Sequence, residues 1–367
     1  MTRTRTAALA LASAAILLAG CAPNQTSSGG AADGGSKKVF FLLPNATTTR
    51  FEERDAPAFK KYMQQMSPGT DVEVLNAQGD PDKQQNQVND AITQGASAIV
   101  LVSADANLAS GSLRTAAQAK VPVILYEHDA VGGPVTAQIA FNATQVGEEQ
   151  GKEAAALIDK MPGQGLAIAR VKGNPGEYGT NQYEAGQDKY LQPLIDSGKI
   201  KVVCDKNITN WDPVQGQSFA EDCLTKENNK VDLFVTMNDG LAGGIVAALT
   251  SQNLVGKIPV TGGQDANLDA VQFVAEGKLD NTVFKNLDTQ AKTAAEVTTS
   301  VIKGQGVPKN LVNGTLDNKF MKVPTVFLPV QNMTKDNLNV VVDAGFYTWK
   351  QICQGAENAD VCKQHGA

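Results

Sequence analysis

Residues 72–102 read VEVLNAQGDPDKQQNQVNDAITQGASAIVLV, and they contain the alternation that decides the fold. The apolar runs 72–75 and 98–102 have the length of short buried strands. Between them, residues 82–94 carry Val88, Ala91 and Ile92 on one face of an expected helix. Strand, helix and strand in this order predict a βαβ unit, with parallel strands covered on both faces.

The same alternation extends in both directions from this unit. Runs 39–43 and 123–126 complete the strands of a first lobe. The pattern then restarts, which predicts a second lobe of similar build. Two such halves fit a chain of 367 residues. The fold class is therefore α/β, with two doubly wound parallel-sheet lobes. The expected strands of the second lobe are 139–141, 166–171, 202–204, 233–236 and 258–260, and its expected helices are 145–158, 181–194, 217–226 and 241–251.

The first twenty residues have the pattern of a signal peptide. Arg3 and Arg5 precede an apolar run at 7–18. This run is shorter than the roughly 20 apolar residues that a membrane-spanning helix needs. We therefore expect residues 1–20 to be removed on export.

The end of that run, Leu18-Ala19-Gly20-Cys21, resembles a bacterial lipobox. The resemblance implies that Cys21 is lipidated and becomes the first residue, which would anchor the protein to the outer face of the cell membrane. Residues 21–36 are rich in Gly, Ser and Ala and are expected to form a flexible linker. The alternative is an ordinary signal peptide that happens to end near a cysteine.

Four cysteines remain once Cys21 is set aside: Cys204, Cys223, Cys353 and Cys362. In an oxidising compartment they predict two disulfides, for which three connectivities exist. Pairing by proximity in the chain favours Cys204–Cys223 and Cys353–Cys362. Their spacing does not suit a metal site, and the chain has only two histidines.

Composition and motifs argue against several classes of function. The net charge of −6 gives no electrostatic support for nucleic-acid binding. No G-x-G-x-x-G follows the first strand and no G-x-S-x-G exists, so neither a dinucleotide cofactor nor a hydrolase is expected. An EF-hand-like spacing begins at Asp265, but Ala270 stands where the calcium loop needs glycine. We expect no enzyme activity, no cofactor and no metal.

Five segments carry a resemblance to a known family: 76–102, 190–203, 237–249, 262–271 and 282–297. In order and spacing they resemble the type I periplasmic sugar-binding proteins, most closely their xylose-binding branch. The resemblance implies two lobes joined by three crossovers, with a ligand cleft between them. It places lobe 1 at 37–128 plus 266–312, and lobe 2 at 129–265 plus 313–367 with a C-terminal extension.

The resemblance also implies a set of ligand-binding residues. They lie at or just past the carboxyl ends of expected strands, where open parallel sheets bind their ligands. Aromatic rings in this set would cover the faces of a sugar, and charged groups would bond its hydroxyls. The matched residues are Arg50, Phe51, Trp211, Asn238, Asp239, Gln264, Asp265 and Lys285.

Other positions of the expected cleft depart from the xylose-binding pattern. An Asp-Arg pair is here Glu127-His128, an aspartate is here Asn142, and a polar turn here contains Tyr178. Replacing a bidentate arginine changes the hydrogen bonds that a site can offer. We therefore expect Glu127, His128, Asn142 and Tyr178 to decide which sugar fits.

Together, these observations predict an exported, monomeric binding lipoprotein. It would capture a monosaccharide or similar polyol, xylose-like as a first expectation, and deliver it to an ABC import permease. The main alternative is a sugar sensor that presents its closed form to a chemoreceptor or signalling kinase. A repressor of this fold would need a DNA-binding head where this chain has its signal peptide.

Overall fold

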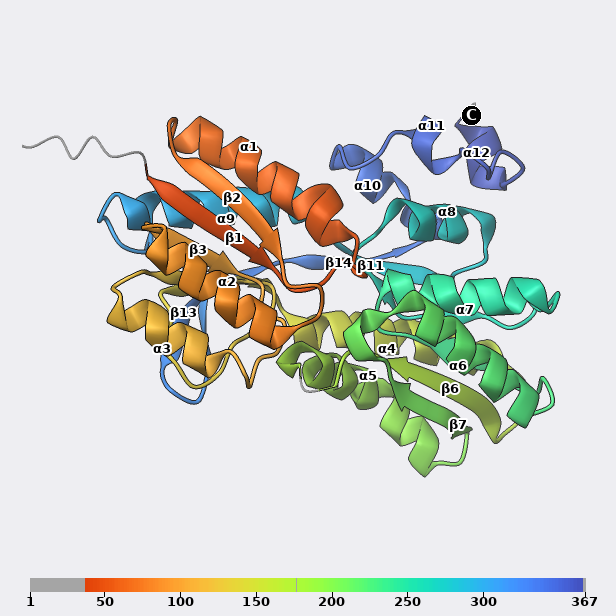
Figure 1. Ribbon diagram of the computed structural model, residues 1–367. Helices are drawn as coiled ribbons and strands as arrows, with labels where there is room; N and C mark the ends of the chain where they lie inside the picture. The colour runs from red at the N-terminus through yellow and green to blue at the C-terminus, as the bar shows by residue number, and fades with distance from the viewer. Residues whose placement is uncertain (1–36, 176, 366–367) are drawn as a thin grey trace, which may run out of the picture. The chain divides into compact units, whose positions relative to one another are not determined.

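The computed structural model describes residues 37–175 and 177–365, except for the side chain of Tyr178. Strands and helices alternate through these residues, and they form two groups built on parallel strands, which we call lobe 1 and lobe 2 (Figure 1). No helix within the described ranges has the length and apolar character needed to cross a membrane.

Lobe 1 contains a seven-stranded sheet in the order β12-β13-β5-β4-β3-β1-β2. Adjacent strands of this sheet run parallel, except that β12 and β13 are antiparallel to each other. On β1, Phe41 joins one apolar cluster, whereas Phe40 and Leu42 join another on the opposite face. Both faces are thus buried, as parallel strands require. The strands are β1 (Lys38–Leu43), β2 (Asp71–Asn76), β3 (Ala98–Leu101), β4 (Val123–Tyr126), β5 (Ala137–Phe141), β12 (Gly314–Asp317) and β13 (Lys322–Leu328).

Helices cover the two faces of this sheet. Helices α1 (Ala56–Met66) and α9 (Leu287–Ile302) pack together on the face that Phe41 joins. Helices α2 (Pro81–Thr93) and α3 (Ser110–Gln118) cover the other face. Asp80, in the segment 72–102, is the N-cap of α2, and its carboxylate accepts hydrogen bonds from two backbone N–H groups of the first turn.

Lobe 2 is built on the parallel sheet β7-β6-β8-β9 and the smaller sheet β10-β11-β14. Helices α4 and α5 pack closely, because Gly147 and Gly186 leave no side chain between them: a Cβ at either position would lie 2.2–2.4 Å from a backbone oxygen of the other helix. The strands are β6 (Leu166–Lys172), β7 (Ile200–Asn207), β8 (Leu233–Val235), β9 (Val260–Thr261), β10 (Gly263–Gln264), β11 (Asn281–Lys285) and β14 (Val330–Thr334), and the helices are α4 (Ala143–Lys160), α5 (Tyr178–Asp196), α6 (Pro213–Lys226), α7 (Asp239–Ser251) and α8 (Leu268–Glu276).

The chain passes between the lobes three times: from β5 to α4, from β11 to α9, and from β13 to β14. The number of crossovers agrees with the prediction, but their positions do not. Residues 129–141 and 313–328 were expected in lobe 2, yet β5, β12 and β13 belong to the lobe 1 sheet. Residues 266–285 were expected in lobe 1, yet α8 packs on α7, and β11 pairs with β10 and β14. Short apolar runs identify strands but not their partners, and β5, buried along its whole length, fits beside β4.

The C-terminal extension packs on lobe 2, as predicted. Gln272 of α8 donates to the carbonyls of Gln351 and Gln354. The predicted disulfides are both confirmed: Cys353–Cys362 closes this extension, and Cys204–Cys223 links β7 to α6. The extension contains α10 (Asn339–Asp343), α11 (Trp349–Ile352) and α12 (Asp360–Gln364).

Candidate ligand-binding site

Arg50 lies just after β1, at the start of a short helical turn, and its side chain is buried. Its Nε and Nη2 atoms donate to the two oxygens of Asp55 at 2.8 and 3.1 Å. Nη1 reaches Asp265 at 2.9 Å and Glu127 at 3.4 Å, and Nη2 also reaches Gln290 at 2.7 Å. A guanidinium has five N–H donors, so these partners occupy all of them.

Glu127 and Lys285 complete this arrangement. Lys285 Nζ, at the end of β11, lies 2.5 Å from Glu127 Oε1 and 2.9 Å from Asp265 Oδ1. Glu127 Oε2 accepts from Gln290 at 2.8 Å. We call Arg50, Asp55, Glu127, Asp265 and Lys285 the charge cluster. It joins side chains of both lobes.

Burial and neighbouring charges act against each other in this cluster. Burial alone raises the pKa of the Glu127 carboxyl, but Lys285 and Arg50 outweigh it and lower that pKa to about 2. Burial lowers the pKa of the Lys285 ammonium, but Asp265 and Glu127 outweigh it and raise that pKa above its ordinary value. For Asp55, burial dominates and raises the pKa. The cluster's two cations are therefore already engaged by its own carboxylates.

Aromatic side chains lie beside the charge cluster. Phe51 is buried and meets the His128 ring edge-on, with 5.6 Å between the centroids. Trp211 donates from Nε1 to Glu177 Oε2 at 3.0 Å. Next to Trp211, the carbonyl of Asn210 accepts a hydrogen bond from Thr47 Oγ1, which links the two lobes. Both rings are thus held at the place where the lobes meet.

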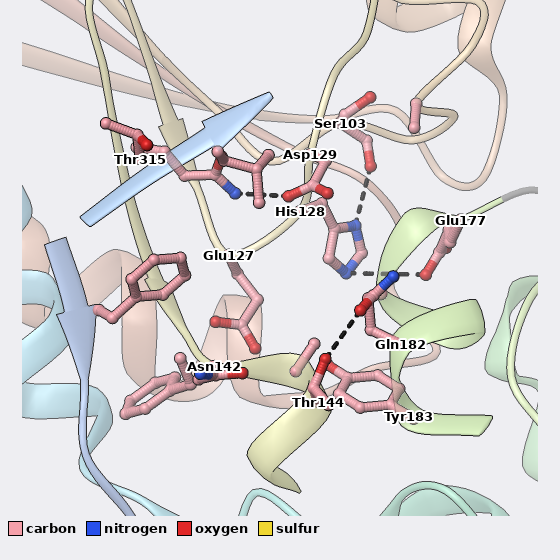
Figure 2. Close-up of a pocket in the computed structure, with 17 residues that line it drawn as sticks. Ser103, Glu127, His128, Asp129, Asn142, Thr144, Glu177, Gln182, Tyr183 and Thr315 are labelled. Atoms are coloured by element: carbon pink, nitrogen blue, oxygen red, sulfur yellow. Dashed lines mark hydrogen bonds and ion pairs between the residues drawn. The ribbon is translucent and has the colours of Figure 1, made fainter. Parts of the chain in front are cut away.

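Two cavities share part of their walls here. The small cavity, of about 30 Å³, is lined by most of the residues that the sequence proposed: Arg50, Phe51, Glu127, His128, Trp211, Asn238, Gln264, Asp265 and Lys285. The large cavity, of about 220 Å³, shares Glu127 and His128 and adds Asn142 (Figure 2). The large cavity thus has about seven times the volume of the small one.

Two asparagines of the predicted set also begin helices. The side chain of Asn238 accepts from the N–H of Leu241 at the start of α7, and that of Asn142 accepts from the N–H of Gln145 at the start of α4. Each therefore has one amide oxygen committed to the backbone. The side chain of Tyr178, also predicted to contact ligand, lies outside the described part of the structure.

Asp239 differs from the prediction, because it lines neither cavity. Its carboxylate accepts from Thr282 Oγ1 at 2.7 Å and from the N–H of Asn267 at 2.8 Å. Burial raises the pKa of this carboxyl well above its ordinary value. Asp239 thus holds the turn in which Asp265 and Ala266 adopt positive φ angles of 97° and 52°. These contacts place Asp239 behind the turn that carries Asp265.

Several residues at these cavities were missed by sequence reasoning. Glu177 and Tyr183 line both cavities, and Asp129 and Gln138 line the large one. Glu177 directly precedes Tyr178, which was proposed from the sequence. The sequence therefore identified this segment, but not the Glu177 side chain. Tyr183 lies inside α5, where its helical spacing is that of a core residue.

Comparisons with known proteins agree with this geometry. Residues 39–306 match the model of the periplasmic binding protein domain. The chain is 33% identical over 301 residues to the D-xylose-binding periplasmic protein of Escherichia coli, covering 82% of this chain and 88% of that protein. It is 28% identical to the multiple sugar-binding periplasmic receptor ChvE of Rhizobium radiobacter, covering 84% and 90%.

Solved structures of transporter solute-binding proteins are similar as well. One from Chloroflexus aurantiacus, in complex with D-glucose, superimposes with a TM-score of 0.75 at 25% identity, covering 86% of this chain and 98% of that one. One from Clostridium phytofermentans, with bound β-D-glucose, has a TM-score of 0.77 at 22% identity, covering 86% and 100%. The second likeness concerns the fold alone.

Proposed function

Because this chain belongs to the periplasmic binding protein family, we propose that it is a solute-binding protein that captures a sugar between its lobes and delivers it to an ABC import permease. Its relatives include a D-xylose-binding periplasmic protein and a multiple sugar-binding periplasmic receptor. The observation that carries the proposal is the meeting of Arg50 and Phe51 of lobe 1 with Asn238, Gln264 and Asp265 of lobe 2 at one cavity.

The chemistry of this wall suits a sugar. A sugar presents hydroxyl groups on its rim and C–H patches on its faces. Asp265 and Asn238 offer polar atoms to hydroxyls, and a hydrogen bond to a charged group contributes about 1.5–3 kcal/mol. Phe51 and Trp211 offer apolar rings to the faces.

A xylose-like aldose is the first ligand that we propose to test. Two relatives named as D-xylose-binding periplasmic proteins, from Escherichia coli and Haemophilus influenzae, are 33% and 31% identical to this chain. Glu127 and His128 depart from the xylose-binding pattern, as described above. Since both oxygens of Glu127 are held by Lys285, Arg50 and Gln290, its role is to position the charge cluster, and His128 is the better candidate for selecting the sugar.

Binding is expected to change the fluorescence of Trp211. The chain has two tryptophans, so a Trp349→Phe variant isolates the signal; Trp349 stacks on His365 in the C-terminal extension. Titration with D-xylose, D-ribose, D-glucose and D-arabinose should give a saturable change for at least one sugar. If sugars raise the melting temperature of this variant without any change in its fluorescence, the ligand does not contact the wall that contains Trp211.

We also propose that Cys21 carries a lipid that holds the exported protein at the outer face of the membrane. The support is the Leu18-Ala19-Gly20-Cys21 segment and the linker after it, which lie outside the described residues. Cells fed labelled fatty acid should label the wild-type protein and not a Cys21→Ala variant. Equal labelling of the two would contradict lipidation at this residue.

A further inference from the structure

The wall of the large cavity contains more negative than positive charge. It includes three carboxylates, of Glu127, Asp129 and Glu177, together with His128, and its lining residues include no lysine or arginine. Lys285 and Arg50 neutralise Glu127. For Asp129 and Glu177, no ion pair with a lysine or arginine is found within the described ranges, and the imidazole Nε2 of His128 lies 4.0 Å from Glu177 Oε2.

Two buried oxygens on this wall have no hydrogen-bond partner among the described residues: Oδ2 of Asp129 and Oε1 of Gln138. The two side chains bond each other through their other atoms, since Gln138 Nε2 donates to Asp129 Oδ1 at 2.6 Å. Asp129 is 8% exposed and Gln138 is 1% exposed. A buried acceptor without a donor destabilises the protein, so a donor supplied from the cavity would relieve that cost.

His128 does not supply this donor. Its Nδ1 lies 2.8 Å from the carbonyl of Ser103, and its Nε2 faces Glu177 (Figure 2). The residues that line the cavity also include no lysine or arginine to attract an anion. It therefore lacks what a uronic acid or a sugar phosphate requires, and it is suited to a ligand that brings donors and positive charge.

We propose that the large cavity is a subsite for a protonated amino group, so that the protein prefers amino sugars over the parent neutral sugars. This inference rests on the proposed function and adds the substrate class. An ammonium group carries three donors and one positive charge, whereas the hydroxyl that it replaces carries one donor and no charge. Asp129 and Gln138 accept two of the donors, and Asp129 and Glu177 balance the charge. A volume of about 220 Å³ leaves room for a ring with such a substituent.

The preference should depend on pH through Asp129. Burial raises the pKa of its carboxyl to about 6, and the titratable groups facing it are His128, Glu127 and Glu177. Above this pKa the carboxylate is ionised and attracts the ammonium group. As the pH falls from 7 to 5 the carboxyl takes up a proton, so the preference for the amino sugar should decrease.

The test is isothermal titration at pH 7 with matched pairs: D-glucosamine and D-glucose, D-galactosamine and D-galactose, D-mannosamine and D-mannose. The wild-type protein should bind the amino member of at least one pair about tenfold more tightly, equal to 1.4 kcal/mol. In Asp129→Asn and in Glu177→Gln, which remove a charge and keep the shape, the preference should fall below about threefold. Asp159→Asn is the matched control, because Asp159 is exposed near the far end of α4.

The outcomes distinguish a failure of the ammonium subsite from a failure of the proposed sugar-binding function. If the wild-type protein binds neutral sugars and prefers no amino sugar, the subsite is wrong and the sugar-binding function stands. If the preference exists but survives both carboxylate replacements, or disappears equally in Asp159→Asn, the subsite is also wrong. If no sugar of any pair binds, and the pentoses named above do not bind either, the proposed function itself fails.

Discussion

Replacing Arg50 with methionine is expected to lower the free energy of unfolding by about 3–5 kcal/mol. Methionine keeps an unbranched apolar stem but removes every guanidinium donor, and with them the hydrogen bonds from Arg50 to Asp55, Asp265 and Gln290. Asp55 is fully buried and would keep the hydroxyl of Tyr126 as its hydrogen-bond donor while losing its counter-charge. Urea unfolding of both proteins at pH 7 measures the difference.

Arg54→Met is the matched control, because Arg54 lies in the same turn but contacts the rings of Phe346 and Tyr347 and a backbone carbonyl. In this control the free energy of unfolding should fall by only about 1 kcal/mol. Adding Asp55→Asn to Arg50→Met should recover part of the stability, because the unpaired charge is then removed. A loss no larger than that of the control would show that the charge cluster does not stabilise the fold.

Replacing Asp265 with asparagine is expected to weaken the binding of every neutral sugar about thirtyfold. This factor corresponds to about 2 kcal/mol, the contribution of one hydrogen bond to a charged group. The carboxylate lies on the small cavity and also receives Arg50 and Lys285, so its loss removes a ligand contact and loosens the cations beside it. Asparagine keeps the shape of the side chain. Affinity is measured by isothermal titration at pH 7.

Asp269→Asn is the control for this variant. Asp269 lies four residues further along the chain, is exposed on α8, and accepts from its neighbour's N–H. Sugar affinity should be unchanged in this control. Circular dichroism of both variants separates a binding effect from unfolding.

The sequence predicted local structure well, because each element has its own signal. The run from 72 to 102 predicted β2, α2 and β3 from apolar periodicity alone, and cysteine proximity predicted both disulfides. Lobe membership was less predictable. Periodicity does not say which strands pair, so β5, β12 and β13 were placed in the wrong lobe.

The role of each residue at the site depends on contacts between segments that are distant in the chain. The spacing of apolar residues in the sequence gives no information about such contacts. Asp239 was proposed as a ligand contact, but Thr282 and Asn267, far along the chain, turn its carboxylate inward. Glu127 was proposed to select the sugar, but Lys285 and Gln290 of other elements hold its oxygens. Residue type and order indicated which side chains gather at the cavities, and the fold decides which groups each of them contacts.

Isothermal titration of D-xylose, D-ribose and D-glucose into the wild-type protein and Asp265→Asn, at pH 7 and with Asp269→Asn alongside, tests the central claim most directly. The expected result is one binding site per chain for at least one sugar in the wild type and the control, with an affinity about thirtyfold lower in Asp265→Asn. Equal affinities in all three proteins would place the ligand away from this cavity. The absence of binding by every sugar to the folded wild-type protein would contradict a sugar-binding function.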